Sequence, residues 1–269
     1  MQSLIGVGLN DSGIKSLSGA EAPRVAGEDG TARLISRAAL HLSRGQSTSR
    51  HSHPAWKVHV GLDAPVWLES SGASFPSSAG ARVVVVPPNV PHATGAVGWS
   101  LAVFVAPGSR GTPWKWQGAP WVASGAEAGR AIELCRGGLC EPSDCDAFVA
   151  DLARAALPQV STSIDGRVRE ALDQLRTNPD VGLPALAAHC ELSLDRLSRL
   201  AIQQTGLPLR RHVLWSRLLR AFTYATQPVA SMAFSAGFSD HAHLTRTYRA
   251  HLGRVPSQFD RPPEVIAPW

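Results

Sequence analysis

The sequence predicts an α+β chain of several domains, in which an N-terminal β-barrel or sandwich is followed by an all-α domain. Two observations predict this fold class. Between about residues 33 and 107, apolar runs such as WKVHVGL and ARVVVVP alternate with Gly, Pro and Ser, as closely spaced strands do. From residue 165 onward, apolar residues recur at helical spacing. A length of 269 residues is enough for two separate cores.

Composition narrows the class of function. We find no run of about 20 apolar residues and no basic leader before an apolar core, so we expect a cytoplasmic protein that makes no use of a membrane. The formal net charge of +5 falls almost wholly in residues 165–269, which hold 13 arginines, no lysine and 9 acidic residues. This excess favours a polyanionic partner, although an ordinary solvated surface has a similar count.

The N-terminal half is expected to contain three segments. Residues 1–30 are rich in Gly and Ser and predict a flexible arm. Residues 31–110 predict the β domain. Residues 111–164 predict a loop, two helical pieces and a linker. The helical pieces carry an apolar face that is a candidate dimer contact, and packing against the chain's own barrel would use the same face.

The four cysteines do not form a recognisable metal or disulfide pattern. Cys135, Cys140 and Cys145 are equally spaced, and Cys190 is distant. The ligands of zinc sites are usually two to four residues apart, so we expect free thiols.

Residues 165–262 predict a domain of helices whose ends can be read from the sequence. The expected helices cover about 167–176, 184–190, 194–205, 208–225, 229–236 and 240–252. Ser193 and Ser239 precede two of them as expected N-cap residues, and Gly206 and Gly253 follow them as expected C-caps.

This domain contains an internal repeat. The segment LAAHCELSLDRLSRLAIQQTG, which starts at Leu186, matches MAFSAGFSDHAHLTRTYRAHLG, which starts at Met232, with one extra residue after the turn in the second copy. Each copy has a short helix, a turn, a capping Ser, a longer helix and a final Gly. The repeat predicts two helix-turn-helix units joined by a long helix. A helical domain that does not bind DNA is the alternative.

Residues from about Val168 to Phe259 resemble the DNA-binding domain of the AraC/XylS family of bacterial transcription regulators. The matching positions are Ala233, Gly237-Phe238-Ser239, Leu244-Thr245-Arg246, Gly253 and Pro256. Leu200-Ala201, Tyr248 and Leu252 depart from the usual residues, and all are expected core positions. The resemblance implies a cytoplasmic regulator that binds double-stranded promoter DNA, as a homodimer, and that contacts RNA polymerase if it is an activator.

The outward faces of the two longer helices are the expected DNA-reading surfaces. Arginine can pair with guanine through two hydrogen bonds, aspartate can accept from cytosine, and a small residue can admit the thymine methyl. The predicted base-reading residues are Asp195, Arg196, Ser198, Arg199, His241, Ala242, His243 and Arg246. The predicted phosphate contacts, which position the protein without specifying sequence, are Ser193, Arg210, Arg211, Arg217, Ser239, Arg249 and Arg254.

The β region carries a second resemblance, to the cupins. Gly45, His51 and His53, followed by Gly80, Pro87 and His92, have the spacing of the two cupin signatures. Lys57 stands where metal cupins have an acidic ligand, and a lysine ammonium repels a divalent cation. The cupin resemblance implies a sensor domain over about residues 33–107.

Three interpretations of this barrel stay open. In the first, His51, His53 and His92 hold a divalent metal such as zinc. In the second, the barrel binds an organic, anionic effector in a pocket lined by His51, His53, Trp56, Lys57, Trp67 and His92. In the third, the barrel has no ligand and only dimerises.

These observations together predict a sequence-specific DNA-binding transcription regulator with a cupin-like sensor domain, and not an enzyme. The rival from another class is a metal-dependent cupin enzyme with a DNA-binding tail. Lys57 and the lack of a paired acid and base argue against that rival.

Overall fold

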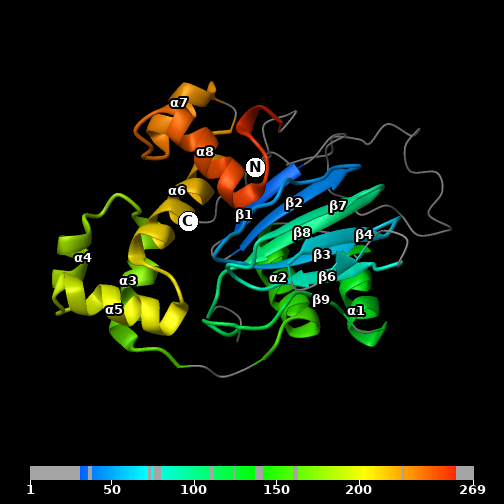
Figure 1. Cartoon of the computed structure of the whole chain (residues 1–269), viewed down its shortest axis with the longest axis horizontal. Coiled ribbons are helices and arrows are strands. Elements are labelled where there is room, and N and C mark those ends of the chain that lie inside the picture. The colour runs from blue at the N-terminus through cyan, green and yellow to red at the C-terminus, as the bar shows by residue number, and fades with distance from the viewer. Residues whose placement is uncertain are drawn as a thin grey trace.

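The computed structural model describes residues 31–35, 38–71, 74–75, 80–108, 112–123, 125–136, 142–159, 163–225 and 227–258. The predicted N-terminal arm, Cys140 and Phe259 lie outside these residues. Nine strands are followed by eight α-helices in the described part of the chain. None of the helices in these ranges is long and apolar enough to cross a membrane. The structure confirms the predicted fold class of a β domain followed by an all-α domain (Figure 1).

The β domain consists of two antiparallel sheets. The first has the strand order β1-β2-β8-β3-β6-β9 and the second has the order β5-β4-β7. The strands are β1 (Thr31–Ile35), β2 (Ala38–Arg44), β3 (Trp56–Gly61), β4 (Val66–Ser70), β5 (Ser74–Phe75), β6 (Val83–Val86), β7 (His92–Ala96), β8 (Trp99–Val105) and β9 (Trp121–Val122). β9 lies in the segment expected to be loop. It pairs with β6, so the sheet continues beyond the expected limit at residue 110.

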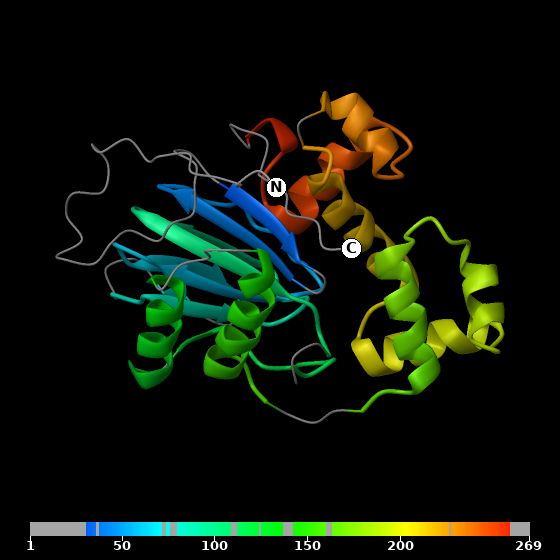
Figure 2. The same cartoon turned by 180° about the vertical axis from the view of Figure 1, so that it is seen from behind.

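Helices α1 (Gly125–Arg136) and α2 (Pro142–Ala156) cover one face of the six-stranded sheet (Figures 1 and 2). The apolar side chains of these helices and of that sheet face form a single core, which includes Trp56, Val58, Leu152 and Ala153. The face of α2 that was a candidate dimer contact therefore packs on the chain's own sheet, with Phe148 and Leu152 buried there. Cys135 is a free buried thiol in the same core.

The opposite face of the six-stranded sheet is unusually polar. Side chains alternate between the faces of a strand, so Lys57 and His59 of β3 lie on the side opposite to Trp56 and Val58. The pairing of strands places His41 and His59 on either side of Ala102, and Phe104 beside Lys57. Lys57 and His59 are at most 5% exposed, so this polar row lies inside the protein.

The helical domain contains two similar units joined by a long helix. The first unit is α3 (Gly166–Thr177), α4 (Leu183–His189) and α5 (Leu194–Thr205), and the second is α7 (Val229–Ser235) and α8 (His241–Leu252). Between them, α6 (Leu209–Phe222) is about 21 Å long at 1.5 Å per residue. A short 3-10 helix, η2, follows at Pro256–Gln258.

Both helical units have their own core, and both touch the β domain. The core of the first unit contains Leu175, Leu186 and Leu197, and Trp114 from the loop before β9 inserts into it. The core of the second unit contains Leu218, Leu244 and Tyr248 and extends to Ala55 of the β domain. The helical domain is therefore seated on the β domain through two separate contacts.

Candidate functional site

The two longer helices of the repeat have matching C-terminal ends. Ser193 caps α5, since its Oγ accepts a hydrogen bond from the Arg196 amide at 3.2 Å, and Gly206 ends it at φ +78°. Gly253 ends α8 at φ +68°. Glycine tolerates this left-handed conformation better than residues with a Cβ, so the two glycines fix where each helix stops.

The N-cap of α8 corrects one prediction. Ser239 was expected to cap the helix, but Asp240 does so, with its Oδ1 accepting from the His243 amide at 2.7 Å. The Ser239 hydroxyl donates to Asp240 and lies 3.2 Å from His243 Nδ1. The extra residue in the second copy of the repeat therefore moves the cap from the serine to the following aspartate.

The predicted base-reading residues lie on the open faces of α5 and α8. Leu197, Leu200 and Ala201 point into the core from α5, as Leu244 and Tyr248 do from α8. The side chains opposite them are exposed or half-buried: Asp195, Arg196, Ser198 and Arg199 on α5, and His241, Ala242, His243 and Arg246 on α8. Both helices therefore present polar outer faces with arginines, joined by one spacer helix.

The predicted phosphate contacts divide into two groups. Ser193, Arg210, Arg211, Ser239 and Arg249 are exposed. Arg217 and Arg254 instead have partners within the protein. Arg217 pairs with Asp180 at 3.2 Å, and Arg254 donates to Gln46 of the β domain and to the Gln258 carbonyl. In this conformation the side chains of both arginines are bound to other parts of the protein. These contacts are not evidence of phosphate binding.

A junction of charged residues joins the two helical units. Asp180, in the turn before α4, forms ion pairs with Arg217 and Arg220 of α6, the latter at 2.6 Å. Gly237, in the turn before α8, has φ +83°, and a Cβ there would lie 2.5 Å from both Arg220 Nη2 and Asp180 Oδ1. Only glycine lets the second turn approach this ion pair so closely. The sequence reasoning did not find Asp180 or Arg220.

A small cavity of about 50 Å³ lies between the β domain and the helical domain. Residues of the polar sheet face and of the loop before β3 line one side, and the helical domain closes the other. The lining residues include His41, Lys57, His59, Phe104, Leu252 and Arg254. A cavity of this size holds only a few water molecules.

The two charged side chains at this cavity, Lys57 and Arg254, are both cations. Lys57 donates to Thr94 Oγ1 at 2.6 Å, and burial lowers the pKa of Lys57 to about 7. Burial, followed by the charges of Arg254 and Lys57, lowers the pKa of His41 to about 3. An anion placed between Lys57 and Arg254 would favour the charged form of the lysine.

Two tryptophans of the predicted effector pocket lie elsewhere. Trp56 packs against Trp116 and Trp121 on the opposite face of β3 and donates to the Pro113 carbonyl at 3.1 Å. Trp67, on β4, lies beside Gly95 of β7 and does not line the cavity. Of the six residues predicted for the effector pocket, Lys57 lines this cavity, and the two indoles and the three histidines are not among its lining residues. His41, His59 and Arg254 also line it, and they were not in the predicted set.

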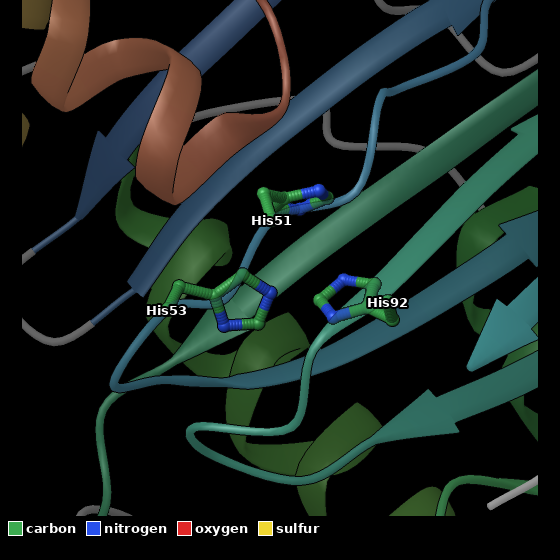
Figure 3. Close-up of side chains that lie close together, drawn as sticks. All are labelled: His51, His53 and His92. Carbon is green, nitrogen blue, oxygen red and sulfur yellow. The ribbon is translucent and has the colours of Figure 1, made fainter. Parts of the chain in front are cut away.

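The three histidines of the predicted metal site lie together (Figure 3). One ring nitrogen from each lies within 4.8 Å of the others, and their ring centroids are 4.2–5.6 Å apart. His51 and His53 come from the segment before β3, and His92 begins β7. All three side chains are at most 4% exposed.

Hydrogen bonds set the same tautomer in all three rings. Their Nδ1 atoms lie 2.8–2.9 Å from the carbonyl oxygens of Ser49, Ala55 and Val90. A carbonyl can only accept, so each Nδ1 carries the proton and each Nε2 keeps a lone pair. The three Nε2 atoms are buried and have no hydrogen-bond partner among the described residues.

This arrangement fits a transition metal. Neutral imidazoles whose other nitrogen donates to a backbone carbonyl are the usual form of histidine ligands. Burial, with the charges of Lys57 and the neighbouring histidines, lowers the pKa of His51 to about 3 and that of His92 to about 2, so both rings are neutral near pH 7. Lys57 itself is held by Thr94 and supplies no ligand. Three nitrogen donors are thus present without the acidic ligand of metal cupins.

Comparisons with known proteins agree with the predicted resemblance. A family model described as a helix-turn-helix domain matches residues 186–262. The HTH-type transcriptional activator RhaS of Klebsiella pneumoniae (strain 342) is 30% identical over 120 residues, which are 43% of this chain and 43% of RhaS. The arabinose operon regulatory protein of Escherichia coli (strain K12) is 29% identical over 104 residues, 36% of this chain and 35% of that protein. The chain covers less than half the length of these relatives.

Solved structures of ToxT from Vibrio cholerae match most of the chain. An apo ToxT variant from strain SCE256 matches with a TM-score of 0.55 and 9% identity, over 83% of this chain and 96% of ToxT. ToxT bound to an unsaturated fatty acid matches with a TM-score of 0.52 and 9% identity, over 91% and 100%. At such identities the likeness establishes the two-domain fold. The chain therefore carries a C-terminal helix-turn-helix domain behind a β-rich N-terminal domain, and it is similar over part of its length to RhaS and to the arabinose operon regulatory protein.

Proposed function

We propose that this chain is a sequence-specific transcription regulator that reads promoter DNA with two helices and responds to a small molecule in its β domain. The repeat carries the proposal: α5 and α8 have matching C-caps and open faces with arginines, and one helix joins them. Helices held in this way can enter successive major-groove segments about 34 Å apart. We propose that the protein acts in the cytoplasm, where such promoter DNA lies.

The proposal is tested by selecting binding sites from a random DNA pool with the full-length chain. The expected result is a site with two half-sites about one helical turn apart. Arg199→Ala and Arg246→Ala should each relax the sequence preference in a different half-site. A pool that shows no enrichment at fixed salt would reject the proposed function.

We also propose that the effector is an organic anion. Lys57 and Arg254 supply two cations on opposite sides of the interdomain cavity, and Phe104 and Leu252 supply apolar walls. ToxT is related in fold and has been solved with an unsaturated fatty acid bound. The cavity of about 50 Å³ is too small for such a ligand, so its entry would have to part the two domains.

A fatty acid such as oleate is the first ligand to test. It should change the DNA affinity of the full-length chain and leave the affinity of Lys57→Gln nearly unaltered. Lys115→Gln is the control, since Lys115 is an exposed lysine outside the cavity lining and outside the predicted DNA contacts. An equal response of wild type and Lys57→Gln would show that this cavity does not bind the anion.

Three further parts of the proposal concern partners and chemistry. We propose that the chain is a homodimer, that it contacts RNA polymerase if it activates, and that it is not an enzyme. The exposed sides of α1 and α2, around Arg130, Leu134 and Arg154, enclose a shallow hollow and are the candidate contact between copies. Sedimentation of the full-length chain tests the dimer. Turnover of a substrate by the metal-loaded chain would contradict the last part.

A further inference from the structure

The three-histidine cluster lies where the second helical unit is seated on the β domain (Figure 3). The ring of His53 is 5.0 Å from Phe104 of β8 and 6.0 Å from Trp215 of α6, measured between centroids. Gly253, at the end of α8, approaches His51 so closely that a Cβ would lie 2.7 Å from its Nδ1. The helical domain therefore forms part of the wall around the cluster.

The backbone segment 49–52, which carries His51, is held from two sides. On one side it forms a bridge with His92: the amide of each of these two histidines donates to the carbonyl of the other at 2.9 Å. This bridge fixes two of the three imidazoles relative to each other.

On its other side, the same segment is bonded to the end of α8. The amides of Ser49 and Ser52 donate to the carbonyls of Gly253 and Ala250 at 2.9 and 3.1 Å. The Ser49 hydroxyl also donates to Gly253, and the His251 Nδ1 donates to the Ser52 carbonyl at 2.8 Å. The position of α8 and the aim of His51 therefore depend on one short piece of chain.

The Nε2 atoms of the three histidines make no hydrogen bond in the described part of the structure. Three buried acceptors without partners are costly, since each has lost its hydrogen bond with water. A single bound cation would satisfy all three at once. Imidazole nitrogen suits zinc and its neighbours in the transition series, and three such donors leave room for water or an anion as a further ligand.

We propose that His51, His53 and His92 bind one divalent transition-metal ion, and that this ion fastens α8 to the β domain. The ion and the docked helix both stabilise the same conformation of residues 49–52, so each strengthens the binding of the other. The metal thus biases the position of the second reading helix. The consequence for DNA binding rests on the proposed function. The binding of the metal ion and the docking of α8 do not depend on it.

Metal binding is tested on the full-length chain, stripped with a chelator and titrated with Co²⁺ or Zn²⁺ alone. The expected result is one ion per chain, with a Co²⁺ absorption spectrum typical of nitrogen ligands at low coordination number. His92→Gln should weaken binding by at least about 100-fold. His59→Gln is the matched control, because His59 is also buried in the β domain but outside the cluster. Failure of the wild type to bind a stoichiometric ion overturns the site.

The coupling has two tests that need no DNA. First, Zn²⁺ should slow hydrogen exchange at the Ser49 and Ser52 amides in the wild type and not in His92→Gln. Second, His251→Leu removes the bond to the Ser52 carbonyl without touching a ligand, and should weaken Zn²⁺ binding about fivefold, the worth of one hydrogen bond. His243→Leu makes the same change at the other end of α8 and should leave Zn²⁺ affinity unaltered.

The outcomes of these experiments distinguish the inference about the metal ion from the proposed function. Unchanged exchange, together with equal Zn²⁺ affinity in wild type and His251→Leu, would overturn the fastening of α8 even if the ion binds. If His92→Gln does not fold, the wild-type spectrum and the His251→Leu comparison still decide the question. A chain that binds metal and selects no DNA rejects only the proposed function. A chain that selects DNA and binds no metal rejects only this inference.

Discussion

Gly237→Ala tests how the two helical units are held together. The residue has φ +83°, where a side chain costs about 1–2 kcal/mol relative to glycine. The new Cβ would also lie 2.5 Å from Arg220 Nη2 and from Asp180 Oδ1, so the ion pair between them must move. Asp180 is 47% exposed, so we assign the lost pair no more than about 1 kcal/mol. The expected loss in the free energy of unfolding is about 1–3 kcal/mol.

The assay is urea unfolding of the full-length chain, followed by circular dichroism of the helices, with native-state hydrogen exchange in α7 and α8 to locate the loss. Gly166→Ala is the matched control. A Cβ there meets nothing within 4 Å, and alanine favours the helix, so stability should stay equal or rise by up to about 1 kcal/mol. If Gly237→Ala costs no more than Gly166→Ala, the close approach at this junction does not stabilise the domain.

Three other predictions follow from single residues. Arg199→Ala and Arg246→Ala should each weaken specific DNA binding by about 1–3 kcal/mol at fixed salt, and unchanged affinity in both would reject these two as base-reading residues. Leu152→Ala, at a fully buried position between α2 and the sheet, should lower the free energy of unfolding by about 2–5 kcal/mol in urea titrations, whereas a loss below that range would mean that the site collapses around the gap. Burial raises the pKa of Cys135 from 9.0 to about 12, so its thiol should resist iodoacetamide at pH 8 until urea is added; because the folded pKa is the higher one, its stabilising effect should fade as the pH rises above about 9.

Much of the helical domain could be predicted from the sequence because its signals are local. The capping serine at Ser193 and the glycines at Gly206 and Gly253 act within one turn of the residues they cap, and apolar spacing shows which face is buried. The cap of α8 was misplaced by one residue, since Ser239 and Asp240 are both good N-cap residues. Which of the two caps the helix depends on where its first hydrogen-bonded turn begins, and the sequence alone does not give that position.

The histidine cluster and the interdomain cavity were harder to predict because they depend on contacts between distant segments. The signature spacing placed His51, His53 and His92 together, and the structure brings them within one cluster. Trp56 was assigned to the same pocket as its neighbour Lys57, although adjacent residues of a strand point to opposite faces.

Other members of the site carry no local signal at all. His41 reaches the cavity only because β2 lies beside β8, and Arg254 reaches it only because the helical domain is seated on the barrel. The ion pair of Asp180 with Arg217 and Arg220 likewise joins segments that are far apart in sequence. Strand order and domain docking decide these contacts, and no pattern within a single segment encodes either.

Site selection from a random DNA pool shows whether two similar helices read DNA together. We expect two half-sites about one turn apart, with Arg199→Ala erasing the preference in one and Arg246→Ala erasing it in the other. Enrichment of one undivided site that both variants still select, or no enrichment, would contradict this expectation.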